Sequence, residues 1–567
     1  MKPLIFLSLL ITIITSCSRQ EAVEKNVYAW YKSPVIYNLD VEVFKDSDSN
    51  GIGDFQGLTS KLDYLESLGV DMIWLAPFQP TPNKDDGYDV SDYYGIDDRL
   101  GTEADFQQFM AEAKRRKLRV IMDVVLNHSS LDHPWYQTAR KDTNSAKHDW
   151  YVWSKERPDD WDEGMGFPEV ETETWTYDSI AEKYYFHRFY THQPDLNFEN
   201  DDVLEEAKRI LSYWLDKGMD GFRLDAVPFI IDLPKTSSAD PEHDFDILTQ
   251  LSSHVKAQKP EAVLLGEANV EPEDNELYFG VNGDGLHMMF NFYANQYLFY
   301  GLATGDVSLF EDALEDTKEK PGAAQWAYFL RNHDEVDLGR LSEDQIEEVY
   351  SRFGPDTSMR VYDRGIRRRL APMLNNDMQH LRMAYSLLFS LPGTPVIRYG
   401  EEIGMGDDLR LKERLAVRTP MQWSDGKNGG FSTAAETFRP VIGFGDYDYT
   451  KLNVQNAEKD PESLLNFIKH LIRLREESPS LVRGQWKVLD SDSENVLIIQ
   501  YSYDDETLIA CHNFSDQAEE FSFASEAAKG TFLELISNKE TNFDRQKDKI
   551  QVQIEPYGHR WYKAGGI

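Results

Sequence analysis

The sequence predicts an α/β protein built on a closed (β/α)8 barrel, the TIM-barrel fold. Eight short apolar runs alternate with segments whose apolar residues recur at helical spacing. Parallel strands connected by helices are typical of such a barrel. The apolar runs are Val35–Leu39, Met72–Phe78, Arg119–Val125, Gly221–Val227, Ala262–Ala268, Leu286–Phe292, Trp326–Asn332 and Thr394–Tyr399. A length of 567 residues also favours one large domain with appendages over a single small core.

The first units of the barrel follow this alternation closely. The segment after the first strand should end at Gly69, because glycine adopts the left-handed conformation that closes a helix. Its leucines recur at helical spacing and are Leu58, Leu62, Leu65 and Leu68. The next helix is predicted over Asp105–Lys117, between the second and third strands.

The uneven spacing of the strands predicts two further parts. A stretch rich in Trp, Tyr and Asp separates the third and fourth strands, and an unstructured loop of that length is rare in a compact domain. We therefore interpret residues 128–200 as an inserted subdomain, so that the barrel comprises residues 30–127 and 201–477. Residues 478–567 carry short alternating runs and no helical period, which predicts a C-terminal β-sandwich.

Residues 1–17 resemble a targeting segment rather than part of the fold. Lys2 precedes an apolar run, Pro3–Ile14, that is short for a membrane span. The run leads into Thr15, Ser16 and Cys17, as in the signal of bacterial lipoproteins, in which the cysteine becomes the lipidated N-terminus. We expect an exported lipoprotein of the bacterial cell envelope, periplasmic or attached to the outer membrane, held by this anchor alone. An ordinary secretory signal and an uncleaved anchor are the alternatives.

The composition excludes several classes of partner and cofactor. The chain has 59 basic and 99 acidic residues, a net charge of −40, which argues against binding to nucleic acid or to anionic membrane surfaces. Cys17 and Cys511 are the only cysteines, so no disulfide framework is expected. No Gly-rich loop of the phosphate-binding kind follows a strand, which argues against a nucleotide or redox cofactor.

Ionisable residues gather at the C-terminal ends of four predicted strands. These ends are Asp123–His128, Gly221–Asp225, Leu265–Asn269 and Arg331–Asp334. In a barrel of this kind, catalytic groups project from the C-terminal ends of the strands. Carboxylates and histidines brought together at one mouth would be unfavourable unless they perform a function. The sequence therefore predicts an active site there.

The same four segments resemble the signature regions of the α-amylase superfamily, glycoside hydrolase family 13. The similarity runs from about Trp30 to the C-terminus, and within the family the chain most resembles the trehalose synthases, which convert maltose to trehalose. The motifs that carry this resemblance are Gln193–Asn197, Arg331–Glu335, Arg369–Leu374 and Arg418–Trp423. Together they are highly specific.

The resemblance implies bond cleavage through a covalent glucosyl intermediate. The oxocarbenium-like transition state needs a carboxylate beneath the anomeric carbon and a proton donor at the leaving oxygen. Asp225 fits the nucleophile, and Arg223, on the same side of the strand, is expected to keep it ionised. Glu267, between small and apolar neighbours, is expected to keep a raised pKa and to act as acid and then as base. By resemblance, Asp334 is the third carboxylate, which binds sugar hydroxyls.

Further residues are assigned to substrate binding by the same resemblance. His128 and His333 would hydrogen-bond the glucose that Asp334 holds. Asp85 and Arg418 match a pair that closes the pocket over the terminal non-reducing glucose in exo-acting relatives, and Tyr88 would stack on that sugar. The alternative for Asp85 is a polar loop residue without this role.

The chain departs from the family pattern in two places. The segment Arg398–Glu402 replaces a common Tyr-Tyr-Gly-Asp-Glu, and Val270–Pro272 replaces the usual Gln-Trp-Pro. Both are expected near the barrel mouth, where the acceptor sugar would lie. A structural ion pair with nearby acids is the alternative for Arg398.

Two metal sites are predicted. The segment Asp46–Asp54 places oxygen ligands at alternate positions with Gly51 at the sharp turn, like the first part of a calcium loop. The resemblance implies a structural Ca²⁺ or Mg²⁺ bound by Asp46, Asp48, Asn50, the carbonyl of Ile52, and Asp54. It also implies a second site formed by Asn127, Asp195 and Asp232. A turn without a metal is the alternative for the first segment.

Three functions are compatible with these residues. The first is a retaining enzyme that interconverts maltose and trehalose while released glucose stays bound. The second is an exported exo-α-glucosidase that hydrolyses maltose and malto-oligosaccharides, which the lipoprotein-like signal favours. The third is a non-catalytic α-glucan-binding lipoprotein. Because all three catalytic carboxylates are present, we predict an enzyme acting on small α-glucosides, with interconversion as its main reaction.

Overall fold

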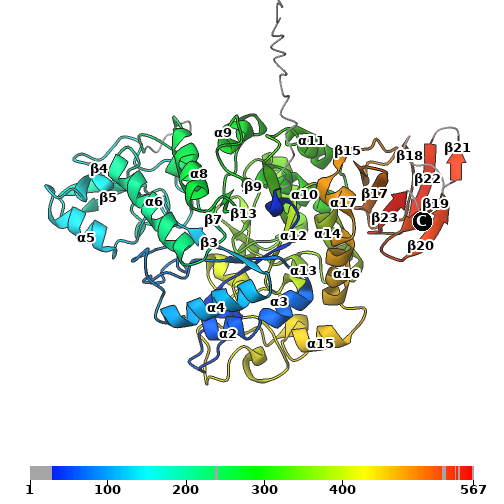
Figure 1. Ribbon diagram of the computed structural model, residues 1–567, viewed down its shortest axis with the longest axis horizontal. Coiled ribbons are helices and arrows are strands. Elements are labelled where there is room, and N and C mark those ends of the chain that lie inside the picture. The colour runs from blue at the N-terminus through cyan, green and yellow to red at the C-terminus, as the bar shows by residue number, and fades with distance from the viewer. Residues whose placement is uncertain (1–28, 236–240, 526–530, 543, 547–548, 565–567) are drawn as a thin grey trace, which may run out of the picture.

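The computed structural model describes residues 29–235, 241–525, 531–542, 544–546 and 549–564. The predicted signal segment and Cys17 therefore lie outside the described residues. Figure 1 shows three parts side by side: the inserted subdomain with α5, β4 and β5 on the left, the barrel in the centre, and the C-terminal sheets on the right. Among the described residues, no helix has the length and apolar character needed to cross a bilayer.

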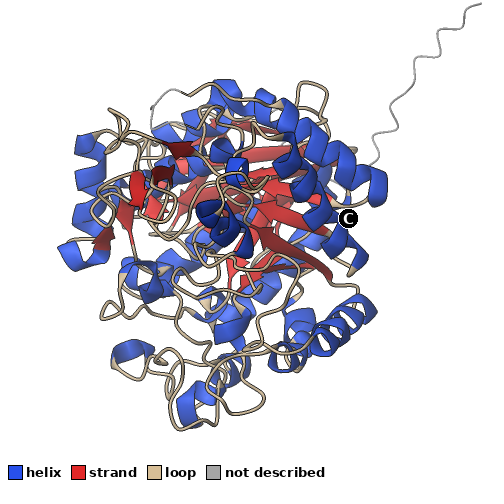
Figure 2. Cartoon of the chain, turned by 90° about the vertical axis from the view of Figure 1, so that its left-hand side faces the viewer, coloured by secondary structure: helices blue, strands red, loops and turns tan. Residues whose placement is uncertain are grey.

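The central part is the predicted closed barrel of eight parallel strands. Its order is β1-β14-β10-β9-β8-β7-β3-β2, and Figure 2 shows the strands surrounded by helices. The strands are β1 (Ile36–Leu39), β2 (Met72–Leu75), β3 (Arg119–Val124), β7 (Gly221–Leu224), β8 (Val263–Gly266), β9 (Met288–Phe290), β10 (Gln325–Phe329) and β14 (Thr394–Arg398). Each overlaps one predicted run. Several runs continue past the strand end because buried apolar residues such as Phe78 lie in the following loops.

Side chains alternate between the barrel interior and the surrounding helices. On β3, Ile121 packs with Trp74 and Phe290 inside the barrel, whereas Val120 and Met122 join the outer core. This alternation follows from the two-residue period of a strand. Both faces of the sheet are buried, which explains why the strands appear in the sequence as continuous apolar runs.

The larger helices of the barrel part cover the outside of the sheet. They are α4 (Glu103–Arg115), α6 (Asp201–Asp216), α8 (Asp246–Gln258), α10 (Phe292–Thr304), α11 (Ser308–Asp316), α12 (Glu343–Phe353), α14 (Met378–Ser390) and α16 (Leu464–Glu476). Shorter helices are α1 (Val41–Phe44), α2 (Phe55–Thr59), α3 (Leu62–Leu68), α7 (Val227–Ile230), α9 (Asn275–Phe279), α13 (Leu370–Met373), α15 (Val454–Lys459) and α17 (Pro479–Arg483).

Two helix predictions need correction in their bounds. The leucine-rich segment forms two short helices, α2 and α3, and ends at Gly69 with φ of 91°, as predicted. Helix α4 begins two residues before the predicted Asp105, because Thr102 and Asp105 cap its first turn reciprocally. This capping fixes the N-terminal boundary more strongly than the hydrophobic period does.

The predicted insertion has its own small sheet. Strand β6 (Lys183–Phe186) pairs antiparallel with β4 (Trp153–Ser154) and with β5 (Trp175–Asp178). Helix α5 (Pro134–Lys141) packs against this sheet through Tyr136, whose ring stacks on Trp153. The bridge between His128 and Asp195 connects the two ends of the insertion. This arrangement brings the insertion back to the mouth of the barrel.

The C-terminal part consists of two antiparallel sheets with a shared core, as the predicted sandwich requires. One has the order β15-β16-β17-β23-β19-β20 and the other β18-β22-β21. Phe521 and Ile550 of the second sheet pack on Ile498 and Ile509 of the first. The strands are β15 (Gln485–Val488), β16 (Val496–Tyr503), β17 (Glu506–Asn513), β18 (Glu519–Ala524), β19 (Thr531–Glu534), β20 (Lys539–Asn542), β21 (Asp544–Gln546), β22 (Lys549–Ile554) and β23 (His559–Ala564).

Candidate active site

A pocket of about 730 Å³ opens at the C-terminal ends of the barrel strands. Its volume is in the range of sites that bind small molecules. Its walls come from the ends of β7, β8 and β10 and from the inserted subdomain, which contributes Phe167, Arg188 and Phe189. The predicted residues Asp85, Tyr88, His128, Asp225, Glu267, His333 and Asp334 all line this pocket.

The guanidinium of Arg223 lies at the centre of the site. Its Nη1 donates to Asp225 Oδ1 at 2.6 Å and to Asp123 Oδ1 at 2.7 Å. Its Nη2 forms an ion pair with Glu267 Oε2 at 2.8 Å. Only 1% of the Arg223 side chain is exposed, so these interactions take place away from bulk water. One buried cation therefore holds the two predicted catalytic carboxylates and a third, Asp123, that was not predicted as a site residue.

The pKa values of the two predicted catalytic carboxylates are both raised. Burial, the largest effect, raises the pKa of Asp225 to about 6, although the Arg223 charge opposes it. Burial also raises the pKa of Glu267 to about 7, with a further contribution from Asp225. The elevated Glu267 pKa agrees with the predicted acid role. Arg223 lowers the Asp225 pKa, as expected for a cation that favours the ionised carboxylate, but desolvation outweighs this ion pair and leaves the pKa at about 6.

Asp334 lies among cations at one end of the pocket. Its Oδ1 accepts from Arg414 at 2.8 Å and from Arg418 at 3.0 Å, and its Oδ2 lies 2.9 Å from His333 Nε2. Burial alone would raise the pKa of Asp334, but these neighbours hold it well below its usual value. Asp334 is thus ionised at neutral pH, as a residue that accepts hydrogen bonds from sugar hydroxyls should be.

The predicted pair between Asp85 and Arg418 does not form. Asp85 Oδ1 instead accepts from Arg414 Nη2 at 2.8 Å, while Arg418 Nη1 donates to Asp86 at 2.9 Å. Arg414 thereby bridges Asp85 and Asp334 across the end of the pocket. Sequence reasoning missed Arg414, because nothing in its surroundings in the chain separates it from other arginines. An acid–arginine pair does lie in the pocket wall, but with a different arginine.

Tyr88 and the two histidines lie beside the carboxylates. The Tyr88 hydroxyl donates to Asp123 Oδ2 at 3.1 Å and lies 2.6 Å from His333 Nε2. Burial lowers the pKa of His128 and of His333 to about 4, so both imidazoles are neutral at neutral pH. They can therefore serve as neutral hydrogen-bonding groups for a sugar.

The two departures from the family pattern lie in different places. Asn269, Val270 and Glu271 line the pocket, as expected for acceptor residues. Arg398 is 1% exposed, donates to Asn38 and Asp40, and is not part of the pocket wall. The segment Arg398–Glu402 is therefore structural, which corrects the expectation that it lies beside the acceptor sugar.

The predicted second metal site contains an ammonium group. Lys235 Nζ donates to Asn127 Oδ1 at 2.6 Å and lies 3.6 Å from Asp195 Oδ2. Asp232 pairs with Arg188 at 3.1 Å. The predicted ligands are thus close together, but Lys235 supplies the positive charge that a metal would supply. The residues around this position therefore do not fit a metal ion.

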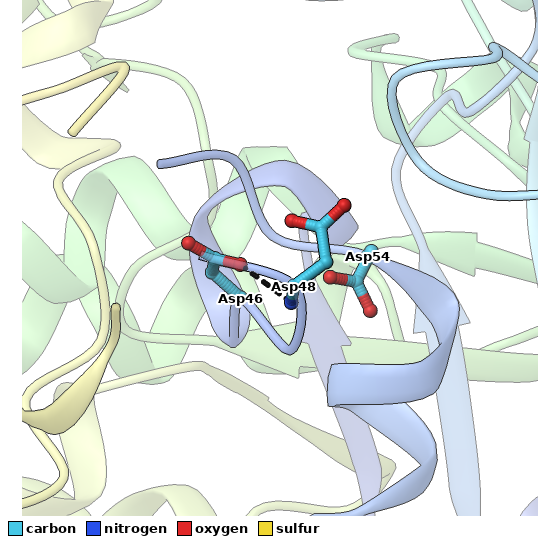
Figure 3. Close-up of side chains that lie close together, drawn as sticks. All are labelled: Asp46, Asp48 and Asp54. Atoms are coloured by element: carbon cyan, nitrogen blue, oxygen red, sulfur yellow. Dashed lines mark hydrogen bonds between the residues drawn. The ribbon is translucent and has the colours of Figure 1, made fainter. Parts of the chain in front are cut away.

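The predicted first metal loop brings three carboxylate groups close together. Carboxylate oxygens of Asp46, Asp48 and Asp54 lie within 4.8 Å of one another, as Figure 3 illustrates. Asp46 also accepts from the backbone amide of Gly51 at 2.8 Å, which holds the loop in its turn. Oxygen donors at this spacing are compatible with Ca²⁺.

Comparison with known protein families assigns both large parts of the chain. The family described as "Alpha amylase, catalytic domain" matches residues 39–354 and 357–484. The family described as "Maltogenic Amylase, C-terminal domain" matches residues 486–561. The second match begins at the C-terminal sheets, just after α17.

Curated relatives include trehalose synthases and oligo-1,6-glucosidases. A trehalose synthase of Thermus thermophilus is 40% identical over 93% of this chain, which spans 55% of that relative's length. A trehalose synthase of Pimelobacter sp. is 39% identical, over 82% of this chain and 83% of the relative. An oligo-1,6-glucosidase of Parageobacillus thermoglucosidasius is 30% identical, over 94% of this chain and 99% of the relative.

Solved structures share the same architecture. The trehalulose synthase MutB superposes with a TM-score of 0.75 at 26% identity, over 94% of this chain and all of that one. An α-amylase from H. orenii gives the same TM-score at 28% identity, also over 94% of this chain and all of that one. With the catalytic-domain match and the geometry of the pocket, these similarities show that the chain belongs to the alpha-amylase family.

Proposed function

We propose that this enzyme interconverts maltose and trehalose through a covalent glucosyl intermediate on Asp225. The observation that carries this proposal is the buried Arg223, which holds Asp225 and Glu267 on its two terminal nitrogens, and both carboxylates line the pocket. This arrangement favours the short carboxylate separation of retaining glycosidases, about 5–5.5 Å. The similarity to two trehalose synthases, at 40% and 39% identity, supports the choice of substrates.

The steps of the proposed reaction are assigned from the protonation states of the pocket carboxylates. Glu267 donates its proton to the glycosidic oxygen while Asp225 Oδ bonds to the anomeric carbon, and the C–O bond to the second glucose breaks. Asp334, held ionised by its cationic neighbours, accepts hydrogen bonds from hydroxyls of the first glucose. The released glucose then turns and presents another hydroxyl. Glu267 removes that proton as the new bond forms and the bond to Asp225 breaks.

A time course with maltose tests this proposal directly. The purified protein beginning after Cys17 is incubated with maltose and Ca²⁺, and the products are followed by NMR. Trehalose that accumulates ahead of free glucose supports interconversion. Glucose released from the start, without trehalose, contradicts it and identifies an α-glucosidase.

Hydrolysis is the second candidate function. The specific observation in its favour is the 30% identity to an oligo-1,6-glucosidase over 94% of this chain. Water would then take the acceptor position, and all the catalytic residues would keep their roles. A non-catalytic binding protein remains the third hypothesis. It requires that Asp225→Ala and Glu267→Gln leave sugar binding intact and that the unmodified protein never turns over.

We also propose that the Asp46–Asp54 loop binds a structural Ca²⁺. Asp46, Asp48 and Asp54 would supply carboxylate oxygens to the ion, and Asn50 and Ile52 would complete the ligand set. The ion would hold the loop in its fold and take no part in bond cleavage. A Ca²⁺-dependent rise in melting temperature is the expected signature.

Attachment to the cell envelope through a lipidated Cys17 is a further proposal. Its support is the apolar run that ends in small residues before this cysteine. Fractionation of cells that produce the full chain tests it. Cys17→Ser should move the protein from the membrane fraction to the soluble fraction, and an unchanged distribution contradicts lipid anchoring.

A further inference from the structure

One carboxyl group in the pocket lacks a partner. Glu335 follows Asp334 in the chain and lines the pocket. Its Oε2 is buried, accepts no hydrogen bond, and forms no ion pair within the described part of the chain. By contrast, Asp225, Glu267 and Asp334 each interact with an arginine. Glu335 thus presents a buried carboxyl oxygen without a hydrogen-bond partner at the pocket wall.

The fold holds the Glu335 side chain in this position. It immediately precedes β11 (Val336–Asp337), which pairs antiparallel with β13 (Gly365–Ile366). A Cβ atom built on Gly365 would lie 2.7 Å from Glu335 Cγ, so the absence of a side chain there leaves room for the stem of Glu335. The carboxyl group is thus directed by a tight backbone contact.

Buried polar groups without partners are unfavourable and usually mark a function. A hydrogen-bond donor that enters the pocket would satisfy this oxygen of Glu335. A sugar hydroxyl is the donor that α-glucosides supply in abundance. The two arginines whose charges act on Glu335, Arg364 and Arg414, already pair with other acids: Arg364 with Asp337, and Arg414 with Asp85 and Asp334.

The position of Glu335 indicates which sugar it meets. Asp337, two residues further along, accepts from Asn269 Nδ2 at 2.6 Å, and Asn269 lies two residues beyond Glu267. Glu335 therefore lies on the wall that continues from the acid Glu267. Glu267 protonates the oxygen between the two sugars, so this wall faces the second one.

We propose that Glu335 accepts a hydrogen bond from a hydroxyl of the second glucose and so determines acceptor specificity. The inference rests on the proposed function, since it assigns the second sugar of that reaction. A glucose held by Glu335 stays in the pocket after the bond breaks and competes with water for the intermediate. Glu335 is thereby a specificity-determining residue for transfer over hydrolysis.

The test compares Glu335→Gln with the unmodified protein on two substrates. Maltose has a second sugar with hydroxyls, whereas p-nitrophenyl α-D-glucoside has an aromatic leaving group with none. The variant should lower kcat/KM for maltose by roughly 10- to 100-fold more than for the aryl glucoside, the range for losing a hydrogen bond to a charged group. The fraction of products that arises by hydrolysis should also rise.

Two further variants guard against a general effect on folding. Glu335→Asp keeps the charge but shortens the side chain, and should show a smaller difference between the substrates. Glu343→Gln, an exposed glutamate at the start of α12, should leave both rates and the melting temperature unchanged. Equal losses on both substrates for Glu335→Gln overturn the inference, because Glu335 would then serve the cleavage step or the fold.

The result of the Glu335 test can be interpreted even if the proposed interconversion of maltose and trehalose is wrong. If the unmodified protein makes only glucose from maltose, interconversion fails, yet the ratio of the two kcat/KM values still reports on Glu335. Calorimetry provides a readout without turnover. Maltose should bind the inactive Glu267→Gln protein at least 10-fold more tightly than the Glu267→Gln, Glu335→Gln double variant, and equal binding contradicts the inference.

Discussion

Arg223 is one buried cation that contacts three carboxylates of the site. It interacts with Asp123, Asp225 and Glu267 at 2.6–2.8 Å while almost fully buried. A single positive charge cannot fully compensate three buried acids, so the pKa values of all three carboxyls are raised, chiefly by burial. The result is that the pKa values of the proposed nucleophile Asp225 and the proposed acid Glu267 are raised to about 6 and about 7.

The pH dependence of the reaction should reflect this pair. Asp225 must be ionised to attack, and its pKa is raised to about 6, so activity should fall as the pH drops through about 6. Glu267 must carry a proton, and its pKa is raised to about 7, so activity should fall as the pH rises through about 7. The profile of kcat/KM for maltose should be a narrow bell whose two limbs belong to the coupled pair.

The control for this profile is Glu267→Gln assayed with α-glucosyl fluoride, whose leaving group needs no proton. This variant should keep the acidic limb and lose the alkaline one. A persistent alkaline limb would assign that limb to a different group.

Lys235 should stabilise the base of the inserted subdomain. Its ammonium lies beside Asn127 and Asp195, and it is 5% exposed. In Lys235→Met, Asp195 would remain buried without this cation, and removing one partner of a buried ion pair costs about 3–5 kcal/mol. Thermal unfolding should show a clear loss of melting temperature. The exposed Lys114→Met should change it little, and equal shifts would refute the assignment.

At the scale of elements, the loops that follow the strands carry the chemistry. The strands themselves are short, and their apolar side chains fill the barrel interior and pack outward on the helices. The polar groups of the site therefore lie in the last residues of the strands and in the loops that follow them. The loop that follows β1 and α1 instead carries the oxygen cluster of the first metal loop.

Calcium should stabilise this loop measurably. Adding Ca²⁺ to the chelator-treated protein should raise its melting temperature, since an ion that binds only the folded state adds about 2.7 kcal/mol at 100 times its Kd. Asp48→Asn should remove most of this Ca²⁺-dependent rise. Asp98→Asn, an exposed aspartate outside the loop, should retain it. A melting temperature that is independent of Ca²⁺ in the unmodified protein would contradict the metal assignment.

At the scale of the whole molecule, the C-terminal sheets are attached to the barrel by a polar and aromatic contact. Trp561 on β23 is fully buried, and its Nε1 donates to Ser386 Oγ on α14 at 3.0 Å. His512 on β17 lies 3.0 Å from the same Ser386 hydroxyl. This contact couples the two parts through one face of α14.

Trp561→Ala should destabilise both parts together. Removing a buried tryptophan leaves a cavity and costs about 3–5 kcal/mol. Denaturant unfolding, followed by near-UV and far-UV signals, should show the loss. The matched control is Trp486→Ala on β15, whose ring is only partly buried. An equally large loss of stability in the control would contradict a specific role of Trp561 in attaching the C-terminal sheets to the barrel.

Much of the architecture could be predicted from local patterns. All eight barrel strands were predicted, because a strand buried on both faces leaves a continuous apolar run in the chain. The inserted subdomain and the C-terminal sheets were predicted from breaks in the alternation. The ends of the helices and strands were predicted less accurately than their existence. Caps such as Thr102 and buried loop residues such as Phe78 shift these ends by a few positions.

The sequence by itself determined the barrel and, through family resemblance, indicated Asp225, Glu267 and Asp334 as the catalytic carboxylates. Only the tertiary structure decided which charges meet: Arg414 rather than Arg418 on Asp85, and Lys235 where a metal was expected. It also left Glu335 without a partner in the pocket. The physical reason is the separation in sequence over which each effect acts. Hydrophobic period and turn chemistry act between neighbours in the chain, whereas ion pairs and desolvation depend on distances between residues far apart in sequence, which folding alone sets.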